Sequence, residues 1–424
     1  MNWKIVILVI VTLTSLYEMA LHFIQYRSAS NPTPENVRDV YDAETHKRWT
    51  EYAGEKCRLK IFASLVSWAV TFVLLMMNAH AAVAKLFSEN LYVQLAVVLA
   101  FQTLLETVFS VTVKYVDTMK IEQKYGFNRS TLKTFVIDQL RSLAIELVLT
   151  IGMTALLAAL HQWLGDGMVL LFAAVLFGFT LLISFLYPLF SRMGNKFVPL
   201  EEGELKEKLT GLLTKHGYRV KAIEVMDASR RTTKSNAYFT GFGRMKTIVL
   251  YDNLVSSMTP DEICAVFAHE MGHGLNRDVL KQQTMNLCNL LLMAVLAWLA
   301  VRTPEVHQAF GFAAVNYGFA FILLGSAALA LVTPLTGMLM SAYSRHAEYR
   351  ADRQAVKEGY GAGLITGLKK LARDNFSHLA PSPLLVVLEY SHPPLSRRIA
   401  AIEKTMVESG SAQDSACLNA AEEK

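Results

Sequence analysis

The segment His269-Glu270-Met271-Gly272-His273 has residue types and spacing suited to metal-assisted hydrolysis. On an α-helix, His269 and His273 lie one turn apart on the same face, so both imidazoles can bind one metal ion. Glu270 lies beside them and can accept a proton from a water on that metal. This HExxH pattern is typical of zinc peptidases, which use two such ligands and a general base. The alternative is a charged helix turn with two solvated histidines, and the surrounding sequence bears on the choice.

The residues before this segment predict a helix that begins just upstream. Thr259 can cap the first turn, Pro260 suits the first helical position, and acidic residues follow it. Ile263, Val266 and Phe267 then form an apolar stripe at helical spacing. The HExxH pattern therefore falls where a helix is expected.

A catalytic zinc ion needs a third protein ligand and an open position for water. Downstream, Glu348 and Asp352 are four residues apart, which again places them on one helical face. We take Glu348 as the candidate third ligand, and Asp352 as a candidate acceptor for the free ring N–H of a ligand histidine. The alternative is a surface helix on which Arg345 pairs with these carboxylates.

The composition indicates an integral membrane protein. Of 424 residues, 53% are hydrophobic and only 18% are charged, with a mean hydropathy of +0.30. The net charge of +5 comes from dispersed Lys and Arg, and no nucleic-acid-binding motif accompanies them. The four cysteines form no CxxC pair, so neither a disulfide framework nor a thiolate zinc site is expected. The expected partners are the lipid bilayer and a peptide or protein substrate. No nucleic acid is expected, and the sequence carries no signal for an oligomeric state.

Seven apolar runs predict a mainly α, multi-pass membrane protein with seven transmembrane helices. The first five are long enough to cross a ~30 Å hydrocarbon core, which takes about 20 helical residues. Between the fifth and sixth runs the chain becomes polar, and short strand-like segments predict a small β element. The spans lie near 5–24, 61–78, 91–113, 143–163, 168–190, 287–301 and 312–335. The strands lie near 222–226, 236–239 and 247–251, and a Gly-rich turn at 241–243 follows the second of them.

These features divide the chain into four parts. Residues 1–194 hold helices one to five with cytoplasmic loops, and 195–284 form a catalytic domain with the HExxH helix. Residues 285–340 hold helices six and seven. Residues 341–424 complete the catalytic domain with the third ligand and end in a polar tail.

Loop charge predicts the orientation of these spans. The loops after spans one, three and five, and everything after span seven, are rich in Lys and Arg, whereas the other loops are nearly bare. By the positive-inside rule the rich side is cytoplasmic. The N-terminus is then outside, and 269–273 and 348–352 lie on the same, cytoplasmic side, separated by two spans.

Glu18, Glu106 and Glu146 fall inside predicted spans, where a carboxylate is costly in contact with lipid. Each is expected to face a neighbouring helix or water. A single such residue is explained by a helix–helix hydrogen bond, but three together favour a hydrated cavity between the spans.

The chain resembles the type I CaaX prenyl protease family of integral-membrane zinc metalloproteases. The resemblance covers nearly the whole chain, including the length, the span count and the orientation. It is carried by Lys124–Asn128, Ser235–Phe239, His269–His273, Glu348–Asp352, and Ser391–Leu395 with Arg398 beyond.

This resemblance implies seven tilted transmembrane helices that form a barrel around a water-filled chamber, capped by a zinc metalloprotease domain. It implies cleavage near the C-terminus of prenylated CaaX proteins, with one Zn²⁺ held by His269, His273 and Glu348 and with Glu270 as the base. Asn236 and His392 correspond to active-site residues near the reacting carbonyl, and Arg398 to a basic residue that supports the site. On sequence alone, Asn236 is better explained as a turn or strand-end residue, and His392 as a capping residue in a Pro-rich turn.

The C-terminus Ala420-Ala421-Glu422-Glu423-Lys424 lacks a dilysine retrieval signal, which favours a bacterial inner membrane over the endoplasmic reticulum membrane of a eukaryote. A prenylated substrate is not expected in most bacteria, so other membrane-tethered peptides remain candidates. Two further functions are considered: a membrane-protein quality-control metalloprotease, and a non-enzymatic transporter or scaffold. The full set of ligands and base argues against the latter.

Overall fold

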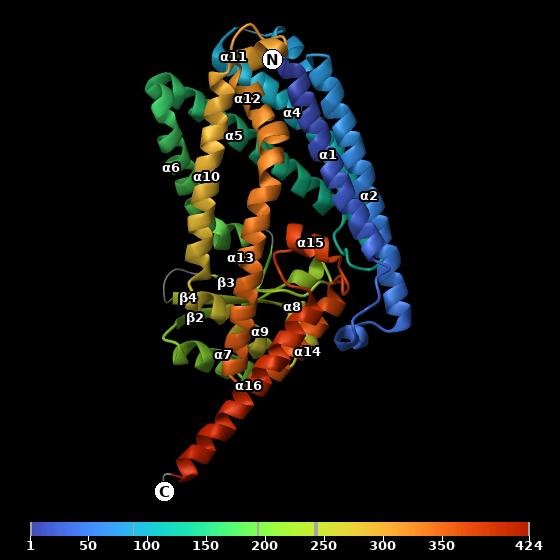
Figure 1. Ribbon diagram of the computed structural model, residues 1–424, viewed down its shortest axis with the longest axis vertical. Helices are drawn as coiled ribbons and strands as arrows, with labels where there is room; N and C mark the ends of the chain where they lie inside the picture. Colours follow the sequence, from blue (N-terminus) through green and yellow to red (C-terminus); the bar gives the residue numbers. More distant parts are fainter. Residues whose placement is uncertain (1, 88, 193–194, 241–244, 423–424) are drawn as a thin grey trace.

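The structure is a computed structural model that describes residues 2–87, 89–192, 195–240 and 245–422. Long helices fill one half of the elongated molecule, and a smaller domain with a sheet lies at the end that also carries the C-terminus (Figure 1). The N-terminus lies at the opposite end (Figure 1). The first helices are α1 Trp3–Ser28, α2 Ala43–Met76, α4 Leu91–Tyr115, α5 Leu132–Leu164 and α6 Met168–Ser191, and the later ones α10 Asp278–Arg302, α12 Tyr317–Leu323 and α13 Ala330–Lys357.

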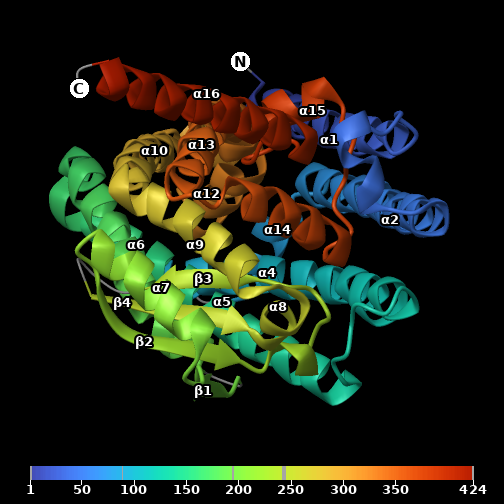
Figure 2. The ribbon, with the colours of Figure 1, turned by 90° about the horizontal axis from the view of Figure 1, so that it is seen from below.

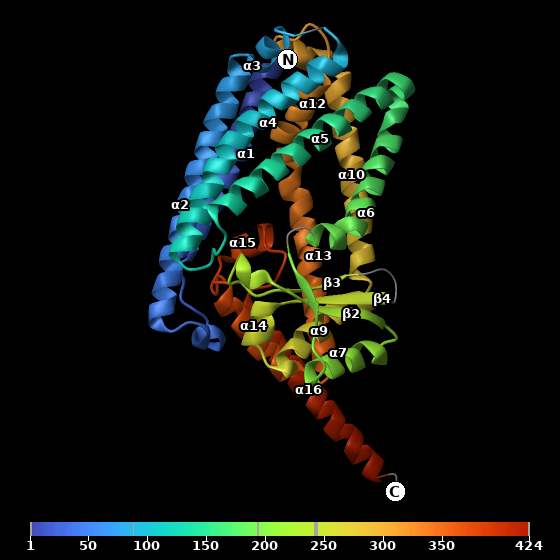
Figure 3. The same cartoon turned by 180° about the vertical axis from the view of Figure 1, so that it is seen from behind.

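The chain is a mainly helical, multi-pass membrane protein, but the count of seven spans is not matched one for one. Within the described residues, six helical stretches are long and apolar enough to cross a membrane. One of them, Leu132–Leu186, is 55 residues long because it contains both α5 and α6. The short 3-10 turn Gly165–Gly167 joins these two helices, which run as separate legs in the views from front and back (Figures 1 and 3).

The last span does not end where its hydropathy suggests. The sequence predicted a span near 312–335, with Glu348 and Asp352 on a helical face beyond it. Instead, α12 leads through a π-helical turn, Leu324–Leu329, directly into α13. Pro334 lies inside α13, where the loss of one backbone donor is tolerated without ending the helix. One helical rod therefore runs from the bundle into the domain at the far end (Figure 1).

A polar cavity of about 360 Å³ lies between the spans. Glu18 of α1, Glu106 of α4 and Glu146 of α5 all line it, together with hydroxyl side chains from the neighbouring helices. Glu106 also accepts a hydrogen bond from Gln102 at 2.6 Å. The three carboxylates thus face an interior space, as the cost of exposing them to lipid required. The lining comes from α1, α2, α4, α5 and the α12–α13 rod, whereas α6 and α10 contribute none of it.

Four described strands form the sheet, in the order β1-β2-β4-β3. β2 and β4 run parallel, whereas β1 and β3 pair antiparallel with their neighbours, so β3 is an edge strand. Helix α7 packs beside this sheet and α9 crosses it (Figure 2). The predicted Gly-rich turn at 241–243 lies outside the described residues. The strands and helices are β1 Phe197–Pro199, α7 Glu204–Lys215, β2 Arg219–Met226, β3 Ala237–Thr240, β4 Met245–Tyr251, α9 Pro260–Leu275, α14 Gly361–Asp374, α15 Pro383–Leu388 and α16 Leu395–Glu422.

Helix α9 begins with the cap that its sequence predicts. Thr259 Oγ1 accepts a hydrogen bond from the Glu262 N–H at 3.3 Å, and Glu262 Oε2 accepts one from the Thr259 N–H at 2.8 Å. This reciprocal pair satisfies two backbone donors that would otherwise lack partners. Ile263 and Phe267 are buried in the domain core, which fixes the face that α9 turns inward. The capped start and the buried stripe together set the direction in which the two histidines point.

Candidate metal centre

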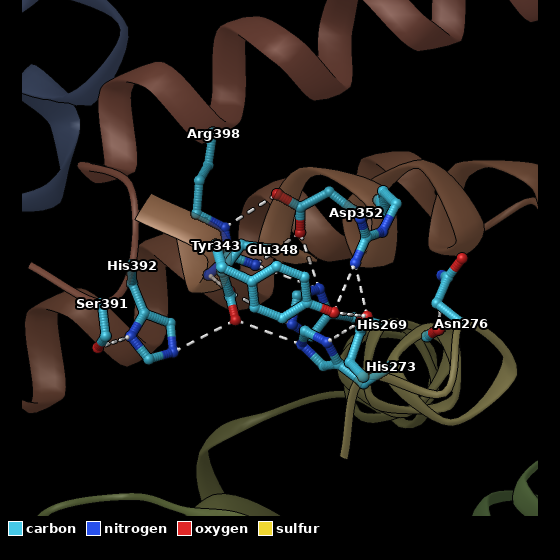
Figure 4. A network of polar contacts seen from close by, with 12 residues as sticks. His269, His273, Asn276, Tyr343, Glu348, Asp352, Ser391, His392 and Arg398 are labelled. Atoms are coloured by element: carbon cyan, nitrogen blue, oxygen red, sulfur yellow. Dashed lines mark hydrogen bonds and ion pairs between the residues drawn. The ribbon is translucent and has the colours of Figure 1, made fainter. Parts of the chain in front are cut away.

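His269 and His273 of α9 meet Glu348 of α13. His269 also meets Asp352, which lies 83 positions further along the sequence. One donor atom from each of the three side chains lies within 4.8 Å of the other two. His269 Nε2 is 3.5 Å from Glu348 Oε2, and His273 Nε2 is 3.3 Å from Glu348 Oε1. Figure 4 shows the two rings and the carboxylate turned toward one another.

Close packing of the two helices makes this meeting possible. At Gly272, a Cβ atom would lie only 2.8 Å from the Ala351 Cα, so α9 and α13 touch almost backbone to backbone. Glycine between the two histidines is therefore a packing requirement here, because any side chain would push the helices apart. Ala351 is fully buried at the same contact.

The donor set fits a divalent metal such as zinc. Two imidazoles and one carboxylate are among the commonest ligands of catalytic zinc. His269 and Glu348 are buried, and Glu348 Oε2 accepts no hydrogen bond although Arg398 Nη1 lies 3.1 Å away. A buried carboxylate oxygen without a hydrogen bond is costly unless something else compensates its charge, and a cation bound at this point would do so.

Each histidine is held on its other nitrogen by a carboxylate. His269 Nδ1 lies 2.8 Å from Asp352 Oδ1, and His273 Nδ1 lies 3.1 Å from Asp278 Oδ2. Since an ionised carboxylate only accepts, both Nδ1 atoms carry a proton, and each Nε2 is the ring atom turned toward Glu348.

Arg398 of α16 ties the two carboxylates of α13 together, and its Nη2 also lies 3.3 Å from His269 Nδ1. It donates to Asp352 from Nε at 3.0 Å and from Nη2 at 2.6 Å, and it forms the ion pair with Glu348. Its guanidinium is buried, so these contacts act in a low-dielectric setting. Arg398 thus fixes the orientation of both acidic side chains.

His392 reaches the cluster from the loop before α16. Its Nε2 lies 3.4 Å from Glu348 Oε1, and its Nδ1 lies 2.9 Å from Ser391 Oγ. The ring is otherwise exposed, with 63% of its side chain accessible, so it borders the open side of the site (Figure 4).

Glu270 is half-buried beside the histidines and is close enough to raise the pKa of both His273 and Arg398 by its charge.

Asn236 lies at the start of the edge strand β3 and is exposed. Its Oδ1 accepts from the Ala237 N–H at 2.9 Å, and its carbonyl accepts from the Tyr251 N–H at 3.1 Å. In the part of the chain that the structure describes, no hydrogen bond joins Asn236 to the His–His–Glu cluster. These contacts of Asn236 are with β3 and β4, at the edge of the sheet.

Asp278, Tyr343 and Arg350 belong to the site but were not singled out from the sequence. Asp278 accepts from Tyr343 Oη at 2.8 Å and from Arg350 Nη2 at 2.5 Å, while its other oxygen faces His273. Arg277, in the left-handed conformation at φ 54°, turns the chain from α9 into α10 and brings Asp278 back onto His273. The sequence does show a carboxylate, Asp278, five residues after the second histidine. Its contact with His273 could not be predicted, because it depends on the backbone turn at Arg277.

The hydrogen-bond partners of His273 control its protonation. Burial disfavours the charged ring, but the hydrogen bonds to Glu348 and Asp278 and the charges of Glu348 and Glu270 outweigh it and raise the pKa of His273 to about 9. In the absence of a metal the ring is therefore protonated on both nitrogens at neutral pH. A metal ion that binds Nε2 must displace the proton on that nitrogen.

A helical membrane bundle joined to a domain with a His–His–Glu cluster and an adjacent glutamate defines the class of integral-membrane metallopeptidases. Comparisons with known proteins agree with this class. The family described as "CAAX prenyl protease N-terminal, five membrane helices" matches residues 22–192, and "Peptidase family M48" matches residues 199–406.

Whole-length relatives identify the family. The chain is 30% identical to CAAX prenyl protease 1 of Saccharomyces cerevisiae, over 95% of both chains, and 26% identical to a human CAAX prenyl protease 1 homolog, over 90% of both. The crystal structure of S. mikatae Ste24p superposes with a TM-score of 0.85 at 27% identity and covers 95% of this chain and 99% of that one. The chain belongs to the CAAX prenyl protease family of M48 peptidases and is a membrane metalloendopeptidase. It is not a transporter or a scaffold.

Proposed function

We propose that this protein is a zinc-dependent endopeptidase that cleaves prenylated CaaX-type or other membrane-tethered peptides near their C-termini. The observation that carries the proposal is the convergence of His269, His273 and Glu348 beside Glu270 in a membrane-embedded chain. The relatives that match over their whole lengths are CAAX prenyl proteases, which supports the substrate class. Their full-length match also favours this function over a quality-control protease with fewer spans.

Zinc bound by His269, His273 and Glu348 would supply a Lewis acid that acidifies water and polarises a peptide carbonyl. Glu270 is placed to accept the proton of the attacking water and to pass it to the leaving amine. Asp352 and Asp278 hold the two imidazoles in the tautomer that leaves Nε2 free. Arg398 keeps Asp352 and Glu348 ionised and in place.

His392 is suited to stabilise the oxyanion that develops on the carbonyl. If Ser391 Oγ donates to Nδ1, the proton of the ring resides on Nε2, which points to the cluster. β3 is an edge strand of the described sheet and directly follows Asn236, so an extended peptide can pair with it by main-chain hydrogen bonds. Asn236 would then touch the peptide at the start of that strand.

The catalytic domain is proposed to face the cytoplasm, because the Lys- and Arg-rich loops lie on its side of the spans. A reporter enzyme fused after Lys424 should be active only when it is of a kind that works in the cytoplasm. Activity of a periplasmic reporter at that end would reverse the orientation.

The test of function uses purified full-length protein with farnesylated and unprenylated CaaX peptides, with product masses as the readout. Cleavage should require zinc, stop with a chelator and return when zinc is restored. Glu270→Gln should retain zinc but lose turnover by about 10²–10⁴-fold, the range for a missing general base. Cleavage that persists in the chelated protein would refute the metallopeptidase mechanism, whereas cleavage only of unprenylated peptides would refute the prenylated substrate alone.

A further inference from the structure

A second cavity, of about 260 Å³, lies between α1, α2 and the loop that precedes the site residue His392. Its α2 wall is a single helical stripe at 49, 52, 53, 56, 57 and 60, and Gln25 of α1 completes that side. The opposite wall comes from Phe376, His378 and Tyr390. At ~30 Å³ per water molecule, the space would hold about nine waters, which is ample for a phosphate group.

Lys60 gives this cavity a cation that has no ion-pair partner in the described part of the chain, while the charge of Glu389 acts on the neighbouring Tyr390. Lys56, one turn away, is neutralised by Glu122 at 2.6 Å and Asp117 at 3.1 Å. Within the described residues, no carboxylate lies within ion-pair distance of Lys60, and Lys60 is exposed. Two further polar side chains that line the space, Gln25 and Tyr390, have no side-chain hydrogen bond among the described residues. Burial raises the pKa of Tyr390 to about 12, so its hydroxyl remains a donor at neutral pH.

The cavity lies at the membrane boundary. Along α2 the charged segment ends at Lys60 and an apolar run follows, and along α1 the apolar run ends just before Gln25. These helices are antiparallel, since Lys4 at the start of α1 donates to the Met76 carbonyl at the end of α2 at 2.7 Å. Gln25 and Lys60 therefore lie near the level of lipid headgroups, with the aromatic rings of Trp49 and Tyr52 on the domain side.

The same cavity adjoins the catalytic loop. Tyr390 immediately precedes Ser391 and His392, and its carbonyl accepts from Arg345 Nη1 at 2.7 Å. Arg345 lies on α13, three residues before Glu348. A ligand that contacts Tyr390 therefore acts on a segment bound both to His392 and to the helix of the third candidate ligand.

We propose that this cavity binds the phosphate of an anionic membrane phospholipid through Lys60, Gln25 and Tyr390, and that its occupancy orders the loop that carries His392. A phosphate supplies the negative charge and acceptor oxygens that these three side chains lack. A lipid is favoured over a free anion because the cavity opens where lipid phosphates are concentrated. The effect on turnover rests on the proposed function, whereas lipid binding does not.

Binding is measured first, independently of catalysis, by native mass spectrometry of the full-length protein titrated with phosphatidylglycerol or phosphatidylcholine. Lys60→Gln should weaken phosphatidylglycerol binding about fivefold, Lys60→Arg should restore it, and phosphatidylcholine should bind weakly to all forms. Lys114→Gln is the matched control, because Lys114 is also an exposed lysine near the end of a span but does not line the cavity. Unchanged phosphatidylglycerol binding in Lys60→Gln would overturn the site.

Two measurements distinguish the proposed lipid from other ligands of the cavity. Inorganic phosphate that displaces the lipid at equal concentration would show a free-anion site and overturn the lipid assignment. If Lys60→Gln raises KM for a peptide with a free C-terminus but not for its amide, the cavity receives the substrate carboxylate, which also overturns the proposal.

In vesicles, phosphatidylglycerol should raise kcat of the wild type about fivefold over phosphatidylcholine, and Lys60→Gln should lose most of that gain. Normal lipid binding without this kcat difference would refute the coupling to His392 alone.

Discussion

Each imidazole of the metal-binding group depends on a carboxylate from a different helix. His269 Nδ1 is hydrogen-bonded to Asp352 of α13, whereas His273 Nδ1 is hydrogen-bonded to Asp278 at the start of α10. Asp278 is in turn fixed by Tyr343 and Arg350. Metal affinity is therefore distributed over residues that touch no metal, since such partners set the tautomer and direction of the ligands.

Asp278→Asn should weaken zinc binding by about 10–100-fold, because the hydrogen bond to His273 loses its charge. Competition of the purified protein with a fluorescent zinc chelator measures this loss. Lys281→Gln is the control, since Lys281 is an exposed residue 4.0 Å from the same carboxylate and should leave affinity unchanged. Equal affinities of Asp278→Asn and wild type would show that His273 needs no such partner.

Zinc binding should release a proton from His273 at neutral pH, because the pKa of the metal-free ring is raised to about 9. The apparent affinity should increase with pH up to about pH 9 and then level off with respect to this group. Calorimetric titrations in two buffers of different ionisation enthalpy count the protons. In Asp278→Asn the plateau should begin at a lower pH, and a pH-independent wild type would contradict the assignment.

At the scale of elements, the contact of α9 with α13 decides whether the ligands meet. The sequence predicted α9 and its Thr259 cap from capping residues and helical periodicity. It also pointed to Glu348 as the third ligand, because a catalytic zinc ion needs one and Glu348 shares a helical face with Asp352. It did not predict that the last span and the helix of Glu348 form one helix, since the apolar run ends near residue 335. Nor could it select Asp278, whose role depends on the backbone turn at Arg277.

Gly272→Ala should separate α9 from α13 and lower both metal affinity and activity by at least tenfold, because the new Cβ would meet the Ala351 Cα at 2.8 Å. Zinc content after dialysis and the rate of peptide cleavage are the readouts. Gly211→Ala in α7 is the control: a Cβ there meets nothing within 4 Å, so this change should be neutral or stabilise the helix by about 0.5–1 kcal/mol. A fully active Gly272→Ala would show that the helices can shift without cost.

At the scale of the whole molecule, a polar cavity lies between the spans, and the protease domain lies at one end of the bundle (Figure 1). The carboxylates of α1, α4 and α5 were predicted to face inward because of their cost in lipid, and they do. The set of helices that line the cavity was not predictable, since it depends on how the spans tilt and pack. The turn at Gly165–Gly167 separates α5 from α6, which correspond to the fourth and fifth predicted spans.

A cysteine at Glu106 should react with a water-soluble maleimide if the cavity is hydrated. Val108 provides the control, because it lies two residues along α4 with a side chain that is 70% exposed toward the surrounding lipid. In a variant without native cysteines, Glu106→Cys should label at least tenfold faster than Val108→Cys in vesicles. Equal, slow labelling at both positions would mean that water does not reach the cavity.

The uninterrupted passage from α12 through α13 has a mechanical consequence. From Pro334 to Glu348 is 348 − 334 = 14 residues, or about 21 Å of helix at 1.5 Å per residue. If this helix moves as one body, a change in its tilt within the membrane also moves its far end. A thinner or thicker bilayer should therefore displace the Glu348 carboxylate relative to α9. Peptide cleavage should therefore peak at one acyl-chain length when the protein is reconstituted in lipids of about 14 to 22 carbons. A flat profile would indicate that Pro334 acts as a joint and uncouples hydrolysis from membrane thickness.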